Sequence, residues 1–230
     1  MVNKNDFSLR ERKYAQTKLA LFHAAQEKLK KKSLKEISVK ELCETIPVSE
    51  MTFFNYFPEK TDLLVYAIQL QALELGWYIK KWEEDHTNLE IIEQIFDYLA
   101  DFCQKEEFPF LVQELKVYFA NTGRPPIFKE ITPAERLLAF PDLPGIEEIQ
   151  TRDLPAILIP YIEKAIEVGE FPTETDFQTV QHAVLAILFG NQLIAMHLNA
   201  FKELKEMYRK QLQLLWFSLR SSDIGKTSHL

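Results

Sequence analysis

Residues 37–64, ISVKELCETIPVSEMTFFNYFPEKTDLL, constrain the fold of this chain more than any other segment. Apolar residues recur there at helical spacing, and Ser38 stands just before them, where its hydroxyl can accept a hydrogen bond from a free backbone N–H. Pro47 cannot continue that helix, and Ser49 can cap a second one. The second helix has a largely polar outer side opposite two phenylalanines four residues apart. Two short helices joined by such a turn are the components of a helix-turn-helix.

The outer side of the second short helix is expected to enter the major groove of duplex DNA. Phe53 and Phe57 take its inner side at i,i+4 spacing. An asparagine can pair bidentately with adenine, a glutamate can accept from the cytosine amino group, and a methionine can lie against a thymine methyl. The predicted base contacts are Glu50, Met51, Thr52 and Asn55.

Residues 10–66 resemble the DNA-binding region of tetracycline-repressor-type (TetR/AcrR family) transcriptional regulators. The matching positions in the two short helices and just after them are Val39, Leu42, Val48, Ser49, Thr52, Tyr56, Phe57, Lys60, Leu63 and Leu64. The preceding helix, expected at residues 9–31, adds Thr17, Leu21, Ala24, Ala25 and Leu29. Beyond these residues the resemblance rests on layout alone.

The resemblance implies an all-α chain of about nine or ten helices that binds double-stranded DNA. A three-helix helix-turn-helix domain at residues 1–57 would bind the DNA, and a larger body at residues 58–230 would sense a ligand and form the dimer. Lys60, in the first turn of a helix expected at residues 59–84, would hold a phosphate together with the free amides there. For Tyr56, packing in the core is an equal alternative. The implied contacts to the DNA backbone are Thr17, Ser38, Lys40, Phe54, Tyr56 and Lys60.

Several residues depart from the usual pattern of the family, among them Ser33, where glycine is usual nearby, and the pair Glu50 and Met51, where small or basic residues are usual. Pro47 stands where glycine is usual, and Phe54 lacks the hydroxyl of the tyrosine usual at its place. Glu50 adds a negative charge at the helix end that would approach DNA. These features keep a second interpretation open, in which the chain is a helical adaptor or antagonist of the same fold that has lost specific DNA binding.

Charge is distributed unevenly along the chain, whose formal net charge is −7. Residues 1–60 contain 12 Lys and Arg against 8 Asp and Glu, whereas the remaining residues contain 15 against 26. A basic amino-terminal part ahead of an acidic body is typical of a DNA reader with a separate domain that does not touch DNA.

Two apolar segments near the end of the chain predict an antiparallel helix pair at residues 175–198 and 201–219. In TetR-like proteins such a pair packs against its twofold copy as a four-helix bundle, so we expect a homodimer, with a purely internal core as the alternative. Two heads held about 34–36 Å apart would then meet successive major grooves of a palindromic operator. The predicted interface residues are Val184, Leu188, Asn191, Ala195, Leu212, Leu215 and Trp216.

The body is rich in aromatic residues, which suits a pocket for a small apolar or amphipathic effector. The resemblance implies that this effector swings the fourth helix, changes the separation of the two heads and releases a repressor from its operator. For each candidate residue, ordinary packing in the core is the competing interpretation. The candidates are Trp77, Phe102, Tyr118, Phe119, His182 and Phe189.

No enzymatic motif is visible in the sequence, which lacks a Gly-rich phosphate loop, a nucleophile elbow and histidines paired at metal-ligand spacing. We therefore expect no enzyme, no cofactor and no metal. Cys43 and Cys103 suit a reducing cytoplasm and are expected to fill apolar space, with a redox-sensing pair as the alternative. The most apolar stretch, residues 183–196, is too short to span a bilayer, and no export signal is visible, so we expect a cytoplasmic protein that does not enter membranes.

Overall fold

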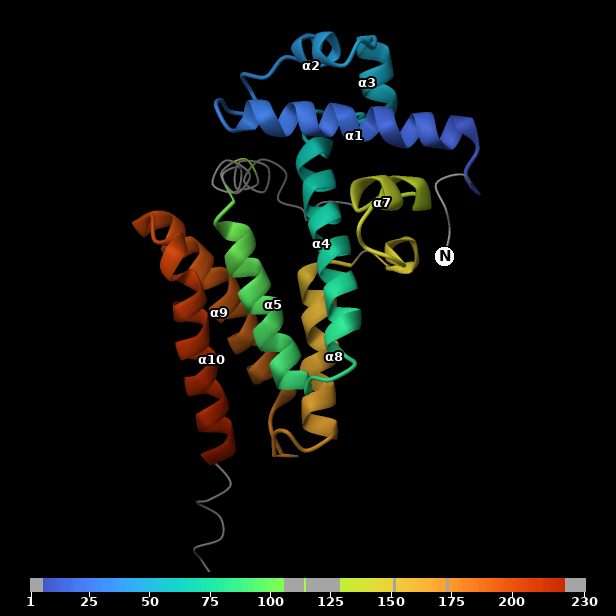
Figure 1. The fold of residues 1–230 in the computed structure, drawn as a ribbon. Helices are drawn as coiled ribbons and strands as arrows, with labels where there is room; N and C mark the ends of the chain where they lie inside the picture. The colour runs from blue at the N-terminus through green and yellow to red at the C-terminus, as the bar shows by residue number, and fades with distance from the viewer. Residues whose placement is uncertain (1–5, 106–113, 115–128, 151, 173, 222–230) are drawn as a thin grey trace, which may run out of the picture. The chain divides into compact units, whose positions relative to one another are not determined.

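The computed structural model describes residues 6–105, 114, 129–150, 152–172 and 174–221. Within these residues every regular element is a helix, which confirms the all-α class (Figure 1). Tyr118 and Phe119, two of the candidate effector residues, lie outside the described residues. The chain forms two compact units: unit 1, from residues 1–77 and 106–152, and unit 2, from residues 78–105 and 153–230.

In unit 1 the helix α1 spans Leu9–Leu29. It begins with a capping box, in which the Ser8 hydroxyl accepts from the Glu11 N–H and the Glu11 carboxylate accepts from the Ser8 N–H at 2.8 Å. It ends two residues earlier than expected, because the Lys31 N–H turns back to the Lys28 carbonyl. The apolar side chains on its inner face are Ala15, Leu19, Leu21, Phe22, Ala25 and Leu29.

The helix-turn-helix is present as predicted, with α2 at Val39–Thr45 and α3 at Glu50–Tyr56. The Ser38 and Ser49 hydroxyls each accept from the backbone N–H three residues on, at 3.0 and 3.1 Å. Ile46, before the proline, leaves the helical region with φ −118° and ψ 75°. The Val48 N–H donates to the Cys43 carbonyl at 3.2 Å, so the turn closes without any residue at positive φ.

The next helix, α4, spans Asp62–Trp82, and the boundary between the two units falls inside it. It was expected from residue 59, but residues 58–61 form a tight turn instead. The Leu63 N–H donates to the Lys60 carbonyl in that turn, and the Asp62 carboxylate accepts from the Glu59 N–H at 3.1 Å. Lys60 therefore precedes α4 rather than lying in its first turn.

A short block completes unit 1: the helix α7 at Pro133–Ala139 and the 3₁₀ helix η2 at Ile146–Glu148. We call residues 129–149 the α7 block. The Arg136 guanidinium holds the block together, since it donates to the carbonyls of Ile131, Glu147 and Ile149 at 2.7–2.9 Å. Figure 1 shows α7 on the opposite side of α1 from α2 and α3.

The compact units do not coincide with the division expected at residue 57. The first part of α4 and the α7 block pack with α1, so unit 1 combines the helix-turn-helix with residues expected in the body. As functional domains, residues 1–57 and 58–230 stay a prediction.

Unit 2 contains α5 at Asn88–Cys103, α8 at Leu154–Glu167, α9 at Phe177–Leu198 and α10 at Leu204–Ser221. Helix α5 packs against α8 and α10, and α9 packs against α8 and α10. The Tyr208 hydroxyl donates to the Leu188 carbonyl at 3.0 Å, and the Trp216 indole donates to Glu93 at 3.0 Å. These hydrogen bonds satisfy polar atoms that α10 places in an apolar interior.

By length and composition alone, α9 could cross a membrane, because it is a helix of 22 residues with few charges. It is longer than the apolar run at residues 183–196 that was judged too short. One face of α9 packs inside unit 2, and its residues Val184, Leu188 and Ala195 have no exposed surface.

The carboxylate of Glu170 links the end of α8 to the start of α5. Gly169 adopts φ 78° after α8, as expected for a C-terminal cap, and the Glu170 N–H donates to the Ala165 carbonyl at 2.8 Å. The Glu170 side chain then accepts from the backbone N–H groups of Asn88 and Leu89 at 3.0 and 2.9 Å. It thereby satisfies amides that a helix start leaves without partners.

We predict that Glu170→Ala lowers the free energy of unfolding by about 1–3 kcal/mol, because two α5 amides lose their acceptor. Urea unfolding followed by circular dichroism measures the change. Glu170→Gln is the matched control, because it keeps one side-chain acceptor and should lose less. Equal stability of Glu170→Ala and the parent protein would contradict the role of this carboxylate.

Candidate nucleic-acid interface

The aromatic core of unit 1 fixes the orientation of α3. Phe53 and Phe57 have 0% and 1% exposed surface. The Phe57 ring packs edge-on against Tyr66 of α4 at 5.7 Å between centroids, and Phe22 of α1 packs edge-on against the same tyrosine at 5.2 Å. Helix α3 therefore has one possible inner face, and its opposite face points outwards.

Three of the four predicted base-contacting side chains lie on that outward face. Met51 is 77% exposed, and Glu50 and Asn55 are also exposed. Thr52 is half-buried, and its hydroxyl lies 2.8 Å from the Ser49 hydroxyl at the start of the helix. Phe54, predicted to lie near the DNA backbone, is 45% exposed. Both of these apolar side chains are thus accessible at the surface of unit 1.

The other predicted backbone contacts have different surroundings. Lys40 is exposed on α2, whereas Thr17 is half-buried on α1. The Ser38 hydroxyl caps α2, as described above. Tyr56 is half-buried, and its ring lies 4.8 Å from that of Tyr14. Both alternatives for Tyr56 are compatible with this position.

Lys60 has partners that the sequence did not indicate. Its ammonium group donates to the Ile37 carbonyl at 2.8 Å and to the Lys35 carbonyl at 3.3 Å. Partial burial lowers the pKa of Lys60 from its usual value. Lys60 thus fixes the chain that leads into α2, and a phosphate contact from the same group stays a prediction.

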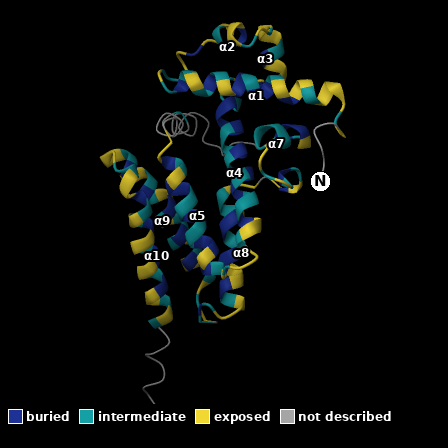
Figure 2. Ribbon diagram, in the orientation of Figure 1, coloured by how far each residue is buried: buried dark blue, intermediate teal, exposed yellow. Residues whose placement is uncertain are grey.

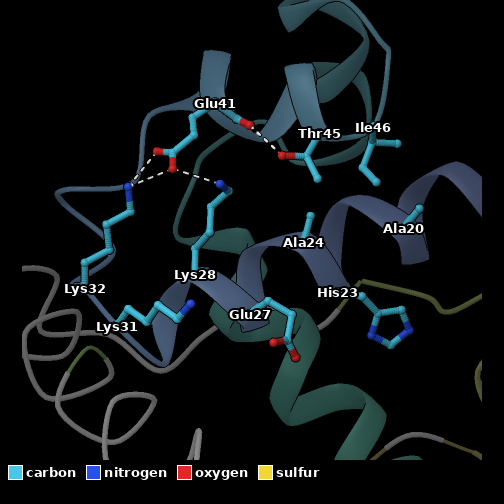
Figure 3. Close-up of a pocket in the computed structure, with 10 residues that line it drawn as sticks. All are labelled: Ala20, His23, Ala24, Glu27, Lys28, Lys31, Lys32, Glu41, Thr45 and Ile46. Carbon is cyan, nitrogen blue, oxygen red and sulfur yellow. Dashed lines mark hydrogen bonds and ion pairs between the residues drawn. The ribbon is translucent and has the colours of Figure 1, made fainter.

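A groove of about 760 Å³ lies between α1 and α2 (Figure 3). Lysines gather at its rim, and the Glu41 carboxylate accepts from Lys28 at 2.8 Å and from Lys32 at 2.7 Å. These hydrogen bonds to Lys28 and Lys32 lower the pKa of Glu41 to about 2. Lys28 near the end of α1 and Lys32 just after it therefore balance the negative charge of Glu41 on α2.

The residues predicted to form the dimer interface lie inside unit 2. Val184, Leu188, Asn191, Ala195, Leu212 and Trp216 are buried, and Leu215 is half-buried. The Asn191 and Gln211 amides hydrogen-bond each other in both directions, at 2.8 and 2.9 Å. Most of the predicted interface residues therefore pack within the protomer.

A second set of apolar residues on the same two helices is exposed, and Figure 2 shows exposed positions along both α9 and α10. Its members are 43–72% exposed. We call it the α9–α10 outer face, and it consists of Phe189, Leu193, Ile194 and Leu198 of α9 with Leu214 and Phe217 of α10.

The candidate effector residues occupy separate surroundings. Trp77 packs against an apolar cluster of Leu73, Ile146 and Ile149 in unit 1, and its indole donates to the Pro144 carbonyl at 2.8 Å. Phe102 of unit 2 lies under the Lys105 ammonium group, 4.9 Å from its ring centroid. His182 and Phe189 are exposed on α9. Tyr118 and Phe119 fall outside the described residues.

Both cysteines are buried and unpaired, as expected for residues that fill apolar space. Burial raises the pKa of both thiols. A raised pKa disfavours the reactive thiolate. In the described part of the chain, no group of three or more His, Cys, Asp or Glu side chains is arranged to hold a metal ion.

Sequence reasoning missed one charged pair inside unit 1. Lys18 of α1 and Glu135 of α7 are 7% and 0% exposed, and their charged atoms lie 2.6 Å apart. The sequence offers little sign of this pair. Glu135 reads only as the third residue of a capping box with Thr132, and 117 positions separate the two partners along the chain.

Comparison with known proteins identifies the fold. One similar structure concerns the control of antibiotic production by bacterial hormones; it has 17% identity and a TM-score of 0.64, with 93% of this chain and 100% of that chain covered. The TetR-family repressor FadR of Thermus thermophilus, in complex with lauroyl-CoA, has 22% identity and a TM-score of 0.59, with 86% and 92% covered. A TetR-family regulator from Shewanella sp. PV-4 has 14% identity and a TM-score of 0.51, with 88% and 97% covered.

No family model and no curated protein sequence matches the chain. The structural similarity nevertheless extends over most of each chain compared. The chain therefore has the fold of TetR-family transcriptional regulators.

We predict that α3 tolerates changes on one face and not on the other. Phe53→Ala should cost about 3–5 kcal/mol, because it leaves a cavity in the core. Met51→Ala, two positions away, should change the stability by less than about 0.5 kcal/mol, because its side chain is exposed. Thermal unfolding of the two variants provides the comparison. Similar losses from both would mean that Met51 packs within the protomer.

Proposed function

We propose that the chain is a transcriptional regulator of the TetR/AcrR family that binds a palindromic operator as a homodimer and responds to a small molecule. One observation carries the proposal: α3 is fixed by buried Phe53 and Phe57 and presents Glu50, Met51 and Asn55 to solvent. A rigid helix with an outward row of side chains that can contact base edges is what recognition in the major groove requires.

The three outward side chains would divide the work of base recognition. Asn55 can donate to and accept from the edge of adenine, and the Met51 thioether can lie against a thymine methyl. Glu50 accepts only, so it favours a cytosine amino group and disfavours a nearby phosphate. The glutamate therefore restricts the operator sequence, and the exposed Lys40 offers a compensating cation for the DNA backbone.

The α9–α10 outer face supports the homodimer. Leu193 is 51% exposed, and Leu214 and Phe217 are 69% and 72% exposed. Several exposed large apolar side chains on two helices packed together are typical of an interaction site. A second copy can cover it through the same face, which gives a closed twofold interface with the two DNA-binding regions in equivalent positions.

The effector is proposed to be a small apolar or amphipathic molecule. The similar structure of FadR holds lauroyl-CoA, an amphipathic compound, and comparable chemistry here would need an apolar, aromatic lining. The cluster of Leu73, Ile146 and Ile149 with Trp77 on α4 is a part of unit 1 with that character. A ligand that moved α4 there would also move the aromatic core that holds α3.

We predict that Asn55→Ala weakens binding to the preferred operator by about 1–3 kcal/mol and leaves binding to random DNA almost unchanged. Lys40→Ala is the contrasting variant and should weaken both by a similar amount, because a phosphate contact carries no sequence information. Selection of bound duplexes from a random pool supplies the operator, and fluorescence anisotropy at fixed salt measures both affinities. Equal losses of specific and non-specific binding in Asn55→Ala would refute its role in base recognition.

The same selection separates the two functional interpretations. A regulator should yield an enriched inverted repeat whose binding survives competitor DNA. A helical adaptor that has lost DNA binding should yield no enriched sequence.

We predict that Leu193→Glu and Phe217→Glu convert a dimer into a monomer, because each places a charge in the apolar interface. Sedimentation velocity measures the mass. Val168→Glu is the matched control, since Val168 is 66% exposed at the end of α8 and does not belong to the α9–α10 outer face. A parent protein that is monomeric at micromolar concentration would rule out the proposed dimer.

A further inference from the structure

The Lys18–Glu135 pair is buried, and both carboxylate oxygens of Glu135 accept hydrogen bonds. The first carboxylate oxygen of Glu135 accepts from the Lys18 ammonium at 2.6 Å and from the Tyr66 hydroxyl at 3.0 Å. The second accepts from the Thr132 N–H at 3.0 Å and from the Thr132 hydroxyl at 2.8 Å. Both oxygens of this buried carboxylate are thus satisfied by two donors each.

The lysine side of the pair lies among aromatic rings. The Lys18 ammonium is 4.4 Å from the centroid of the Tyr66 ring and 5.9 Å from those of Tyr14 and Phe57. Burial and the nearby carboxylate raise the pKa of the Tyr66 hydroxyl, so it donates to Glu135 and stays protonated. The cation is thus held between the core that orients α3 and a carboxylate from α7.

The α7 block is attached to α4 at several further points. The Gln69 amide donates to the Lys129 carbonyl, and the Lys129 ammonium donates to Asp62 at 3.1 Å. Ile149 packs so closely on α4 that a side chain at Gly76 would begin 2.8 Å from its methyl group. With these contacts the block is bound along most of α4, and the Lys18 pair joins it to α1.

From this arrangement we infer that the Lys18–Glu135 pair is a latch through which the position of the α7 block controls the helix-turn-helix. Movement of the block away from α1 would leave a lysine and a glutamate buried without partners. That state is disfavoured so strongly that α1 must follow the block or the site must open to water. The block and α1 therefore behave as one two-state element.

The latch adds a second route to regulation, because the proposed effector signal reaches the helix-turn-helix through α1 as well as through α4. This part of the inference rests on the proposed function. The structural coupling of α1 to the α7 block is independent of the proposed function, and it can be measured without DNA.

The test compares Lys18→Met, Glu135→Gln and the double variant in the full-length chain. Each single variant leaves one buried charge without its partner, whereas the double variant removes both charges. We expect each single change to raise hydrogen exchange in α1 and α7 together by at least about tenfold, and the double variant to return both helices towards the parent values. With the selected operator, we expect each single variant to lose at least about tenfold in affinity and the double variant to regain most of it.

Two further variants complete the experiment, one as a control and one as a milder change at the same site. Glu27→Gln is the control, because it breaks the ion pair with Lys30 at 2.8 Å, which lies at the surface of the same helix. It should leave exchange and affinity unchanged. If Lys18→Met or Glu135→Gln does not fold, Tyr66→Phe is the milder variant to use, because it removes one hydrogen bond to Glu135 and keeps the ring. It should raise hydrogen exchange in α1 and α7 together, to a smaller extent.

Increased exchange in α7 with α1 unchanged, or single losses that simply add in the double variant, would overturn the latch. If no operator is enriched, the proposed function fails, and the exchange measurements still decide whether α1 and α7 are coupled.

Discussion

The ring of Tyr66 is the contact on which unit 1 depends. It makes T-shaped contacts with the rings of Phe22 and Phe57, lies under the Lys18 ammonium, and donates its hydroxyl hydrogen to Glu135. One side chain of α4 thus meets α1, the residue that ends α3, and α7. Because aromatic rings have few rotamers and bury a large area, such a contact transmits a change of position instead of absorbing it. The orientation of the proposed reading helix is therefore a property of α4 as much as of the helix-turn-helix itself.

The amino-terminal helices could be predicted from sequence because their signals are local. Ser38 and Ser49 mark helix starts, Pro47 marks a stop, and the spacing of Phe53 and Phe57 defines an inner face; all of these agree with the structure. The partners of Lys60 and Lys18 could not be predicted, because carbonyls and a carboxylate distant in sequence supply them. The sequence gives the charge of each lysine, but the group that the lysine contacts depends on the fold.

The two carboxy-terminal helices show a different limit of helical periodicity. Both α9 and α10 have apolar residues around much of their circumference, and periodicity does not indicate which stripe faces inwards. Polar residues settle the question in the structure, because the Asn191–Gln211 pair and the Tyr208 hydroxyl bond within the protomer. Six of the seven residues first assigned to an interface are buried within the protomer, whereas Leu193, Leu214 and Phe217 are exposed. Buried amides and hydroxyls are thus a better guide to the inner side than the apolar pattern alone.

The proline between α2 and α3 affects the unfolded chain as well as the fold. The turn contains no residue at positive φ, so it does not need the conformational freedom of glycine. Proline at such a position leaves the unfolded chain fewer conformations to lose and stabilises the folded state by about 0.4–1 kcal/mol. A segment of only two short helices has little other local means of resisting fraying. Pro47 therefore adds to the stability of the helix-turn-helix through the unfolded chain, in addition to the contacts that hold α2 and α3 in the folded unit.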